Sequence, residues 1–245
     1  MNRISGIIVV IFAILLLAYI AFASYAFKDI RRTDVCKSVQ IVVMDSLEKH
    51  FVTEQDLSSL LKRENLYPIN KPMSEINTHA IEECLLKNEL IATAEVYKTP
   101  SGKIKLAVKQ KIPVLRVMSV KGNYYVDNNG TVMPISYRYA AHVPIASGYI
   151  EKEQAVTDLY KFALFLQGNK FWNAQIEQIY ISQDGEVELI PRIGNHRIVL
   201  GRFDDYQKKL ENLRLFYDKV IQKMGWEKYS IINLKYRNQI VCTKK

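Results

Sequence analysis

The stretch TAEVYKTPSGKIKLAVKQKIPVLRVMS, residues Thr93 to Ser119, carries a clear fold signal. Pro100-Ser101-Gly102 is a turn sequence between two runs in which apolar and polar residues alternate. In the second run isoleucine, leucine and valine alternate with lysine. This two-residue period is typical of a strand with one buried and one solvent-exposed face. The stretch predicts a β-hairpin. Pro113 indicates either the boundary of a second region or an edge position through which the strand continues.

The residues before this hairpin predict one strand and two helices. VQIVVMD, residues 39–45, has the composition of a strand. Thr53 followed by Asp56 fits a capping box at the start of a helix, and Ser74 is the expected cap of a second helix. The expected order is strand, helix, helix, strand, strand over residues 38–112.

The residues after Pro113 predict a β-rich domain with a long late helix. The expected elements are a hairpin over residues 122–136, a helix over 151–167, a three-stranded meander over 176–201, a helix over 206–224 and a terminal strand over 230–245. The late helix is expected to turn an apolar stripe toward the core, made of Tyr206, Leu210, Leu213, Tyr217, Val220 and Met224. In the terminal strand Ile232, Leu234 and Tyr236 alternate with polar residues. Almost no chain follows it, so its open edge must be protected or given to a partner. The predicted fold class is α+β.

The first thirty residues predict a membrane anchor. No charged residue occurs between Ile4 and Phe27, a run about as long as the ~20 residues that cross a bilayer. Ala21-Phe22-Ala23 resembles a signal-peptide cleavage site, but the apolar run exceeds the usual 7–15 residues. We expect a tail at 1–3, a transmembrane helix at 4–27 and a juxtamembrane linker at 28–37. The flanking charges leave the orientation open.

The net charge of +9 is spread among acidic residues except between Lys98 and Lys121, where seven basic residues occur without an acid. The general mixture argues against a nucleic-acid-binding surface. The lysines of the hairpin fit a solvated face that protects a sheet edge, or a face that attracts anionic lipid or an acidic partner. These readings stay open.

No stretch of the sequence carries a catalytic or metal-binding signature. The four histidines lack HExxH spacing, and no P-loop, GxSxG or dinucleotide-binding turn occurs. Cys36, Cys84 and Cys242 are too widely spaced for a disulfide framework or a CxxC metal motif. We expect no catalysis, no cofactor and no small-molecule substrate, although residues distant in sequence can still assemble a site.

Four stretches in order resemble the FtsQ/DivIB family of bacterial cell-division proteins. ATAEVYKTPSGKIKLAVKQKIPVLRV is similar to the end of that family's POTRA module, and YYVDNNGTVMP to its following hairpin. VPIASG and NLKYRNQIVCTKK are similar to a short internal element and to the closing strand. Asn233 departs from the family's usual aspartate, and the tail before the anchor is very short.

The resemblance implies a single-pass protein of the cytoplasmic membrane, with a POTRA module at 38–112, an FtsQ-type β domain at 113–245 and its bulk outside the cytoplasm. It implies a non-enzymatic scaffold at the division septum that contacts other divisome members. The implied partners are FtsB- and FtsL-like bitopic proteins, bound by the terminal strand. The site residues implied are Leu234, Lys235, Tyr236, Arg237 and Asn238, with Tyr236 at the interface; Lys244 and Lys245 could steer an acidic segment.

Three other functions remain as alternatives. A POTRA-bearing assembly factor would usually carry several repeats, and none is visible. A membrane-tethered binder of lipid or nucleic acid would use the lysines of residues 103–111 and lose affinity with salt. An anchored enzyme would need titratable residues that converge in a pocket.

Overall fold

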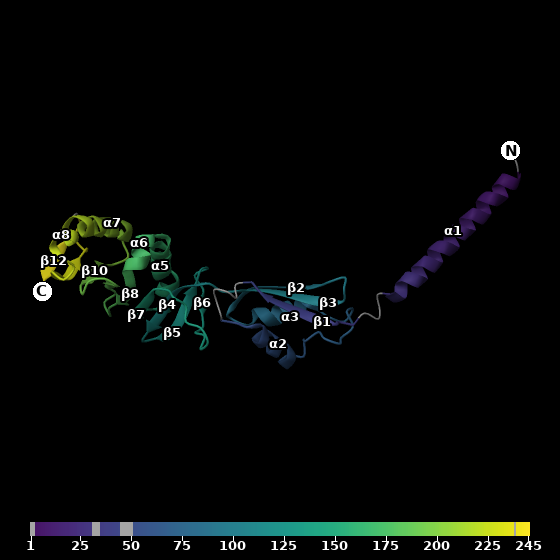
Figure 1. Ribbon diagram of the computed structural model, residues 1–245, viewed down its shortest axis with the longest axis horizontal. Coiled ribbons are helices and arrows are strands. Elements are labelled where there is room, and N and C mark those ends of the chain that lie inside the picture. Colours follow the sequence, from purple (N-terminus) through teal and green to yellow (C-terminus); the bar gives the residue numbers. More distant parts are fainter. Residues whose placement is uncertain (1–2, 31–34, 45–50, 238) are drawn as a thin grey trace. The chain divides into compact units, whose positions relative to one another are not determined.

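A computed structural model describes residues 3–30, 35–44, 51–237 and 239–245. The chain divides into two compact units (Figure 1). The first unit comprises residues 1–48 and 52–110, and the second comprises residues 49–51 and 111–245. Each unit is described by itself below.

The N-terminal segment is a helix, α1 (Arg3–Ile30), of 28 residues. It contains the stretch predicted to span the membrane. Among the described residues, no helix is both long enough and apolar enough to cross a bilayer. Residues 1 and 2 of the predicted tail and residues 31–34 of the predicted linker lie outside the described residues.

The first unit is a three-stranded sheet with two helices. Its strands are β1 (Ser38–Val43), β2 (Ile91–Lys98) and β3 (Lys103–Gln110), and its helices are α2 (Glu54–Arg63) and α3 (Thr78–Leu86). The order in the sheet is β1-β3-β2, with β1 parallel and β2 antiparallel to β3. The predicted succession of elements is confirmed. The expectation that the lysine-bearing strand lies at an edge is wrong, because β3 pairs with β1 on one side and with β2 on the other.

The starts of the two helices test the predicted caps. The Thr53 hydroxyl accepts the Asp56 N–H at 3.3 Å and the Asp56 carboxylate accepts the Thr53 N–H at 3.0 Å, so the capping box is confirmed. The cap of α3 is Asn77, whose side-chain oxygen accepts the Ala80 N–H at 3.1 Å. The prediction of Ser74 was wrong because Pro72 and Glu75 close a turn there before the helix begins.

The described residues of the second unit form a nine-stranded sheet ordered β12-β11-β10-β9-β8-β7-β4-β5-β6. The strands are β4 (Pro113–Ser119), β5 (Gly122–Asp127), β6 (Val132–Met133), β7 (Ile145–Gly148), β8 (Ile176–Ile181), β9 (Val187–Pro191), β10 (Arg197–Gly201), β11 (Tyr229–Asn233) and β12 (Val241–Lys244). The predicted hairpin is β5–β6 and the predicted meander is β8–β9–β10.

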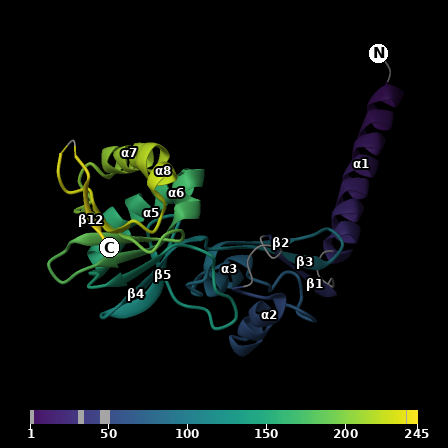
Figure 2. The ribbon, with the colours of Figure 1, turned by 60° about the vertical axis from the view of Figure 1, so that its left-hand side comes forward.

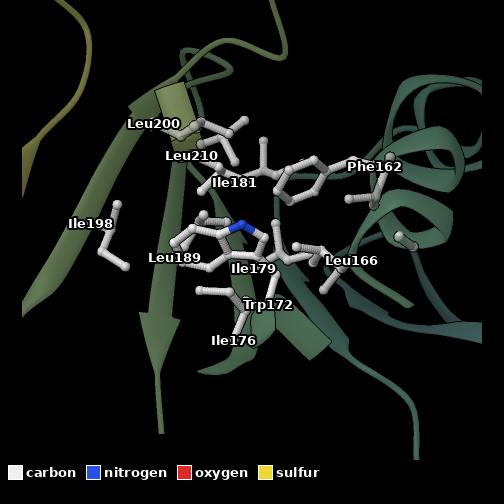
Figure 3. Packing of buried hydrophobic residues seen from close by; sticks show 14 of the residues in the cluster. Phe162, Leu166, Trp172, Ile176, Ile179, Ile181, Leu189, Ile198, Leu200 and Leu210 are labelled. Atoms are coloured by element: carbon white, nitrogen blue, oxygen red, sulfur yellow. The ribbon is translucent and has the colours of Figure 1, made fainter. Parts of the chain in front are cut away.

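The helices of the second unit gather against one face of its sheet (Figures 1 and 2). They are α4 (Lys152–Val156), α5 (Asp158–Gly168), α6 (Lys170–Gln175), α7 (Tyr206–Phe216), a π-helical turn η1 (Tyr217–Ile221) and α8 (Gln222–Met224). Figure 3 shows Phe162, Leu166 and Trp172 packed against Ile179 and Leu189 from the sheet. All five are buried, so this layer of side chains is the core of the unit.

The late helix differs from its predicted form at the π-helical turn. Leu210, Leu213 and Tyr217 face the core as expected, but Ile221 is buried next and Met224 is 52% exposed. A π-helical turn adds a residue to the repeat and therefore shifts the phase of the apolar stripe. The predicted inward position of Met224 was wrong for this reason.

Candidate functional site: the C-terminal hairpin

The last residues of the chain form a hairpin at the outer end of the nine-stranded sheet. β11 runs parallel to β10, and β12 returns antiparallel to β11, with Ile232 opposite Cys242 and Asn233 opposite Val241. Within the described residues β12 pairs with β11 alone. The outer side of β12 is therefore available to another strand.

The residues predicted to lie on the terminal strand instead form the connection of this hairpin. β11 ends at Asn233, and Leu234 to Arg237 have no strand structure; Asn238 lies outside the described residues. The Asn233 side-chain oxygen accepts the Lys235 N–H at 3.0 Å, a local bond of the kind that turns a chain. The alternation of apolar and polar residues from Ile232 to Tyr236 was therefore misread as one strand. Its first part is β11, and its last part belongs to a turn.

Leu234 fixes this connection to the body of the domain. Its side chain is 3% exposed and belongs to the hydrophobic core. Its N–H donates to the Val199 carbonyl at 2.9 Å. Leu234, predicted as a contact residue for a partner, is thus buried in the core, where it holds the connection against the domain.

Lys235 is bound within the molecule. Its Nζ donates to both carboxylate oxygens of Glu186, at 2.6 and 2.9 Å, and these hydrogen bonds raise the pKa of Lys235. Its aliphatic stem passes over Gly201, where an added Cβ would lie 2.8 Å from the Lys235 Cγ. A side chain at position 201 would therefore displace Lys235 from this route.

Tyr236 and Arg237 are the part of the connection that solvent reaches. Both are exposed, Tyr236 by 51%. They line a hollow of about 470 Å³ with residues from the start of α7. Its charged members are Asp204, Asp205, Lys208, Lys209, Lys235 and Arg237. Basic side chains outnumber acidic ones among these residues, so the hollow favours binding of a negatively charged group. No sequence motif singled out Lys208 or Lys209, which lie in the first turn of α7.

The two terminal lysines differ in their contacts: Lys245 is paired within the domain, and Lys244 is exposed. Lys245 Nζ pairs with the Glu227 carboxylate at 2.5 Å, and this hydrogen bond lowers the pKa of Glu227. Lys245 also donates its N–H to the Lys228 carbonyl at 3.2 Å, which fastens the end of β12. Lys244 is exposed, and the described residues offer it no acidic partner.

A buried aromatic cluster supports the hairpin from behind. His196, at 2% exposure, lies 2.9 Å through Nε2 from the Tyr217 hydroxyl and stacks on Trp226 at a centroid distance of 6.1 Å. Its Nδ1 has no hydrogen-bond partner among the described residues, and a Cβ added at Gly194 would lie only 2.7 Å from it. Burial lowers the pKa of His196 and raises that of Tyr217. Sequence reasoning missed this cluster because its members come from three separate segments.

Nothing in this arrangement resembles a metal or cofactor site. No group of histidine, cysteine, aspartate and glutamate residues in the described part of the chain could hold a metal ion. The hairpin combines an unpaired strand edge, one exposed tyrosine and an excess of basic charge. Those properties suit recognition of a polypeptide.

Comparisons with known proteins agree on one relationship. The model of a family described as FtsQ/DivIB, C-terminal related, matches residues 112–243, and a POTRA-like domain matches residues 34–109. Cell division protein FtsQ of Rhodothermus marinus is 25% identical over 186 residues, covering 70% of this chain and 67% of that protein.

A solved structure was also found, the major extracytoplasmic domain of the trans isomer of the cell division protein DivIB from Geobacillus stearothermophilus. It is 11% identical to this chain and has a TM-score of 0.33. The match covers 47% of this chain and 98% of that structure.

Proposed function

Because this chain belongs to the FtsQ/DivIB family it has a role in cell division, and we propose that it acts there as a non-enzymatic, membrane-anchored scaffold of the divisome. The proposed anchor is the uncharged run of residues 4–27, with a tail at 1–3 and a linker at 28–37. A POTRA-like domain at 38–112 and a β domain at 113–245 would lie outside the cytoplasm at the septum.

The observation that carries this proposal is the outer position of β12. A partner segment can add to such an edge as a further strand, with main-chain hydrogen bonds giving affinity and alternate side chains giving selectivity. The proposed partners are FtsB- and FtsL-like bitopic proteins, through which the chain would link early and late division proteins.

The side chains beside the edge have distinct parts in this proposal. Tyr236 would anchor the partner, since an exposed tyrosine offers a large contact area at low entropic cost. Arg237 and Lys244 would attract acidic residues of the partner. Leu234 would hold the connection in position, and Lys235 would reach a partner only by exchanging its bond with Glu186.

Site-specific photo-crosslinking in dividing cells tests this proposal. A photoreactive residue at Tyr236 or Val241 is expected to capture a small bitopic coiled-coil protein. The matched control is Tyr137, an exposed tyrosine of the same domain on the connection between β6 and β7, near the other end of the sheet order. Capture from Tyr137 alone, or only internal crosslinks from Tyr236 and Val241, would place the partner surface elsewhere.

A further inference from the structure

The sheet of the first unit has an uncovered face that carries lysines. On β3 the residues Ile104, Leu106 and Val108 are fully buried, and Lys103, Lys105 and Lys109 alternate with them toward the other face. Figure 1 shows α2 and α3 on one side of these strands. The lysines therefore project from the side that no described helix covers.

The strands that flank β3 add little that would neutralise this face. The register places Ser38 and Gln40 of β1 beside Lys103 and Lys105, and Thr93 of β2 beside Lys109. Tyr97, 43% exposed, lies opposite Lys105, whose Nζ is 5.7 Å from the ring centroid. Glu95, opposite Ala107, contributes the one acid among the strand residues of this face.

Five of the seven basic residues from Lys98 to Lys121 divide into two groups; of the other two, Lys98 donates to the Met73 carbonyl and Arg116 lies over the Tyr125 ring. In the second unit, Lys111 pairs with Asp127 at 3.5 Å and Lys121 pairs with Glu151. In the first unit, Lys103, Lys105 and Lys109 form no ion pair with any described residue. Ion pairs thus account for Lys111 and Lys121, whereas the three lysines of the sheet face have no ion-pair partner among the described residues.

The acidic residues of the first unit lie mainly on its helical side. Between residues 51 and 110 seven acids belong to α2, α3 or their adjoining loops, namely Glu54, Asp56, Glu64, Glu75, Glu82, Glu83 and Glu89. The unit therefore has a basic sheet face and an acid-rich helical face. A negatively charged surface would attract the first and repel the second.

We propose that the uncovered face, formed by Lys103, Lys105, Lys109 and Tyr97, binds the anionic phospholipid headgroups of the membrane. This inference rests on the membrane anchor of the proposed function. Seven residues separate the end of α1 from β1, a reach of about 25 Å at full extension. A tether of that length would hold the face close to a bilayer, where lysines are attracted to anionic lipid and a tyrosine ring suits the interface.

The shape of the face favours headgroups over an acidic protein segment. None of these lysines lines the hollow between α2 and α3 or the hollow at the C-terminal hairpin. A protein partner usually buries anchors in well-packed pockets, whereas headgroups need only accessible charge. The occupant proposed is accordingly the lipid surface.

The test uses the full chain in nanodiscs of phosphatidylcholine alone or mixed with phosphatidylglycerol. Amine-reactive labelling is followed by mass spectrometry at each lysine, and hydroxyl-radical oxidation is followed at Tyr97. We expect several-fold slower modification of Lys103, Lys105, Lys109 and Tyr97 in the anionic discs, with the difference lost at high salt. Lys62 and Lys87 on the helical side should react equally in both.

Two triple variants separate this face from general charge effects. K103Q/K105Q/K109Q should abolish the lipid-dependent protection of Tyr97, whereas K62Q/R63Q/K87Q, which removes three positive charges from the helical side, should retain it. The same loss of protection in both variants would mean that net charge alone acts, and the inference would be overturned.

The remaining outcomes distinguish this inference from the proposed function. Equal modification in both lipid mixtures would overturn the proposal that this face binds lipid headgroups, and it would leave the proposed membrane anchor unaffected. Protection by soluble polyglutamate but not by anionic discs would replace lipid with an acidic polypeptide. Failure of the chain to enter discs in a flotation assay would overturn the anchor and this inference together, while crosslinking from Tyr236 would still report on the hairpin.

Discussion

The outer strands β2 and β12 end their sheets in different ways. Thr99 donates its N–H to the Lys103 carbonyl, so by alternation the Val96 N–H points away from β3. That N–H is taken by the Glu82 carboxylate of α3 at 2.7 Å. β12, in contrast, pairs on one side with β11, and no described helix supplies a similar cap to its other side.

The difference teaches that an outer strand is a binding edge only when its own domain leaves it open. Proteins commonly block exposed edges with charged side chains. Glu82 does so on β2 by occupying a main-chain donor that a client strand would need. This bond disfavours strand addition at the β2 edge of the first unit, and with it an assembly factor that captures clients at that edge.

The largest effect is expected from removing the support of the open edge. Leu234→Ala deletes a core side chain, which should destabilise the second unit by about 2–5 kcal/mol and loosen the hairpin. Chemical denaturation measures the change. Leu215→Ala, on α7 at 53% exposure, is the control and should cost far less. Equal losses in the two variants would show that the hairpin is not held by Leu234.

Opening the blocked edge is expected to have the next largest effect. Glu82→Ala leaves the Val96 N–H without its acceptor, which should destabilise the first unit by about 1–3 kcal/mol. The freed edge should also promote self-association, measured by sedimentation velocity. Glu82→Gln keeps an acceptor oxygen and should remain near the parent. If Glu82→Ala remained monomeric, Glu82 would not be what protects the β2 edge, and the proposed difference between β2 and β12 would be contradicted.

Acid should weaken the support behind β12 through His196. His196 is neutral in the fold because burial lowers its pKa from 6.5. The charge of Lys245 lowers this pKa further, and the charge of Glu227 raises it. The unfolded chain binds the proton more readily, so stability is full above about pH 6.5 and falls as the pH drops toward the folded-state pKa.

Tryptophan fluorescence is the measurement for this prediction, since Trp172 and Trp226 both lie in the aromatic cluster around Tyr217. Denaturation curves between pH 7.5 and 5 should show a loss of stability that His196→Gln flattens, while His79→Gln, at an exposed position of α3, leaves this loss unchanged. The same pH profile in His196→Gln as in the parent would exclude His196 as its source.

The smallest effect is expected from the ion pair beside Tyr236. Glu186→Ala releases Lys235, and because both side chains are partly exposed the stability should change little. Hydrogen exchange of residues 234–237 should nevertheless accelerate, and high salt should reduce the difference from the parent. Lys208→Ala, which lines the same hollow, is the control. No acceleration would show that Leu234 alone orders the connection.

Local patterns in the sequence determined much of the element order. The two-residue alternation of Ile104 to Val108 and the Thr53 capping box each depend on neighbours along the chain, so they could be read directly. The four stretches from residue 92 to the end sufficed to indicate the family. Which residues of the last stretch face a partner was not readable in the same way.

Tertiary structure alone decided the features on which function depends. Pairing of β1 with β3 put the lysine strand in the centre of its sheet, and the Asn233 turn moved Tyr236 from a strand to a connection. The capping of β2 by Glu82 and the burial of His196 against Trp226 join residues fourteen or more positions apart. Such contacts depend on how whole elements pack, and packing is a property of the three-dimensional arrangement that local periodicity does not encode.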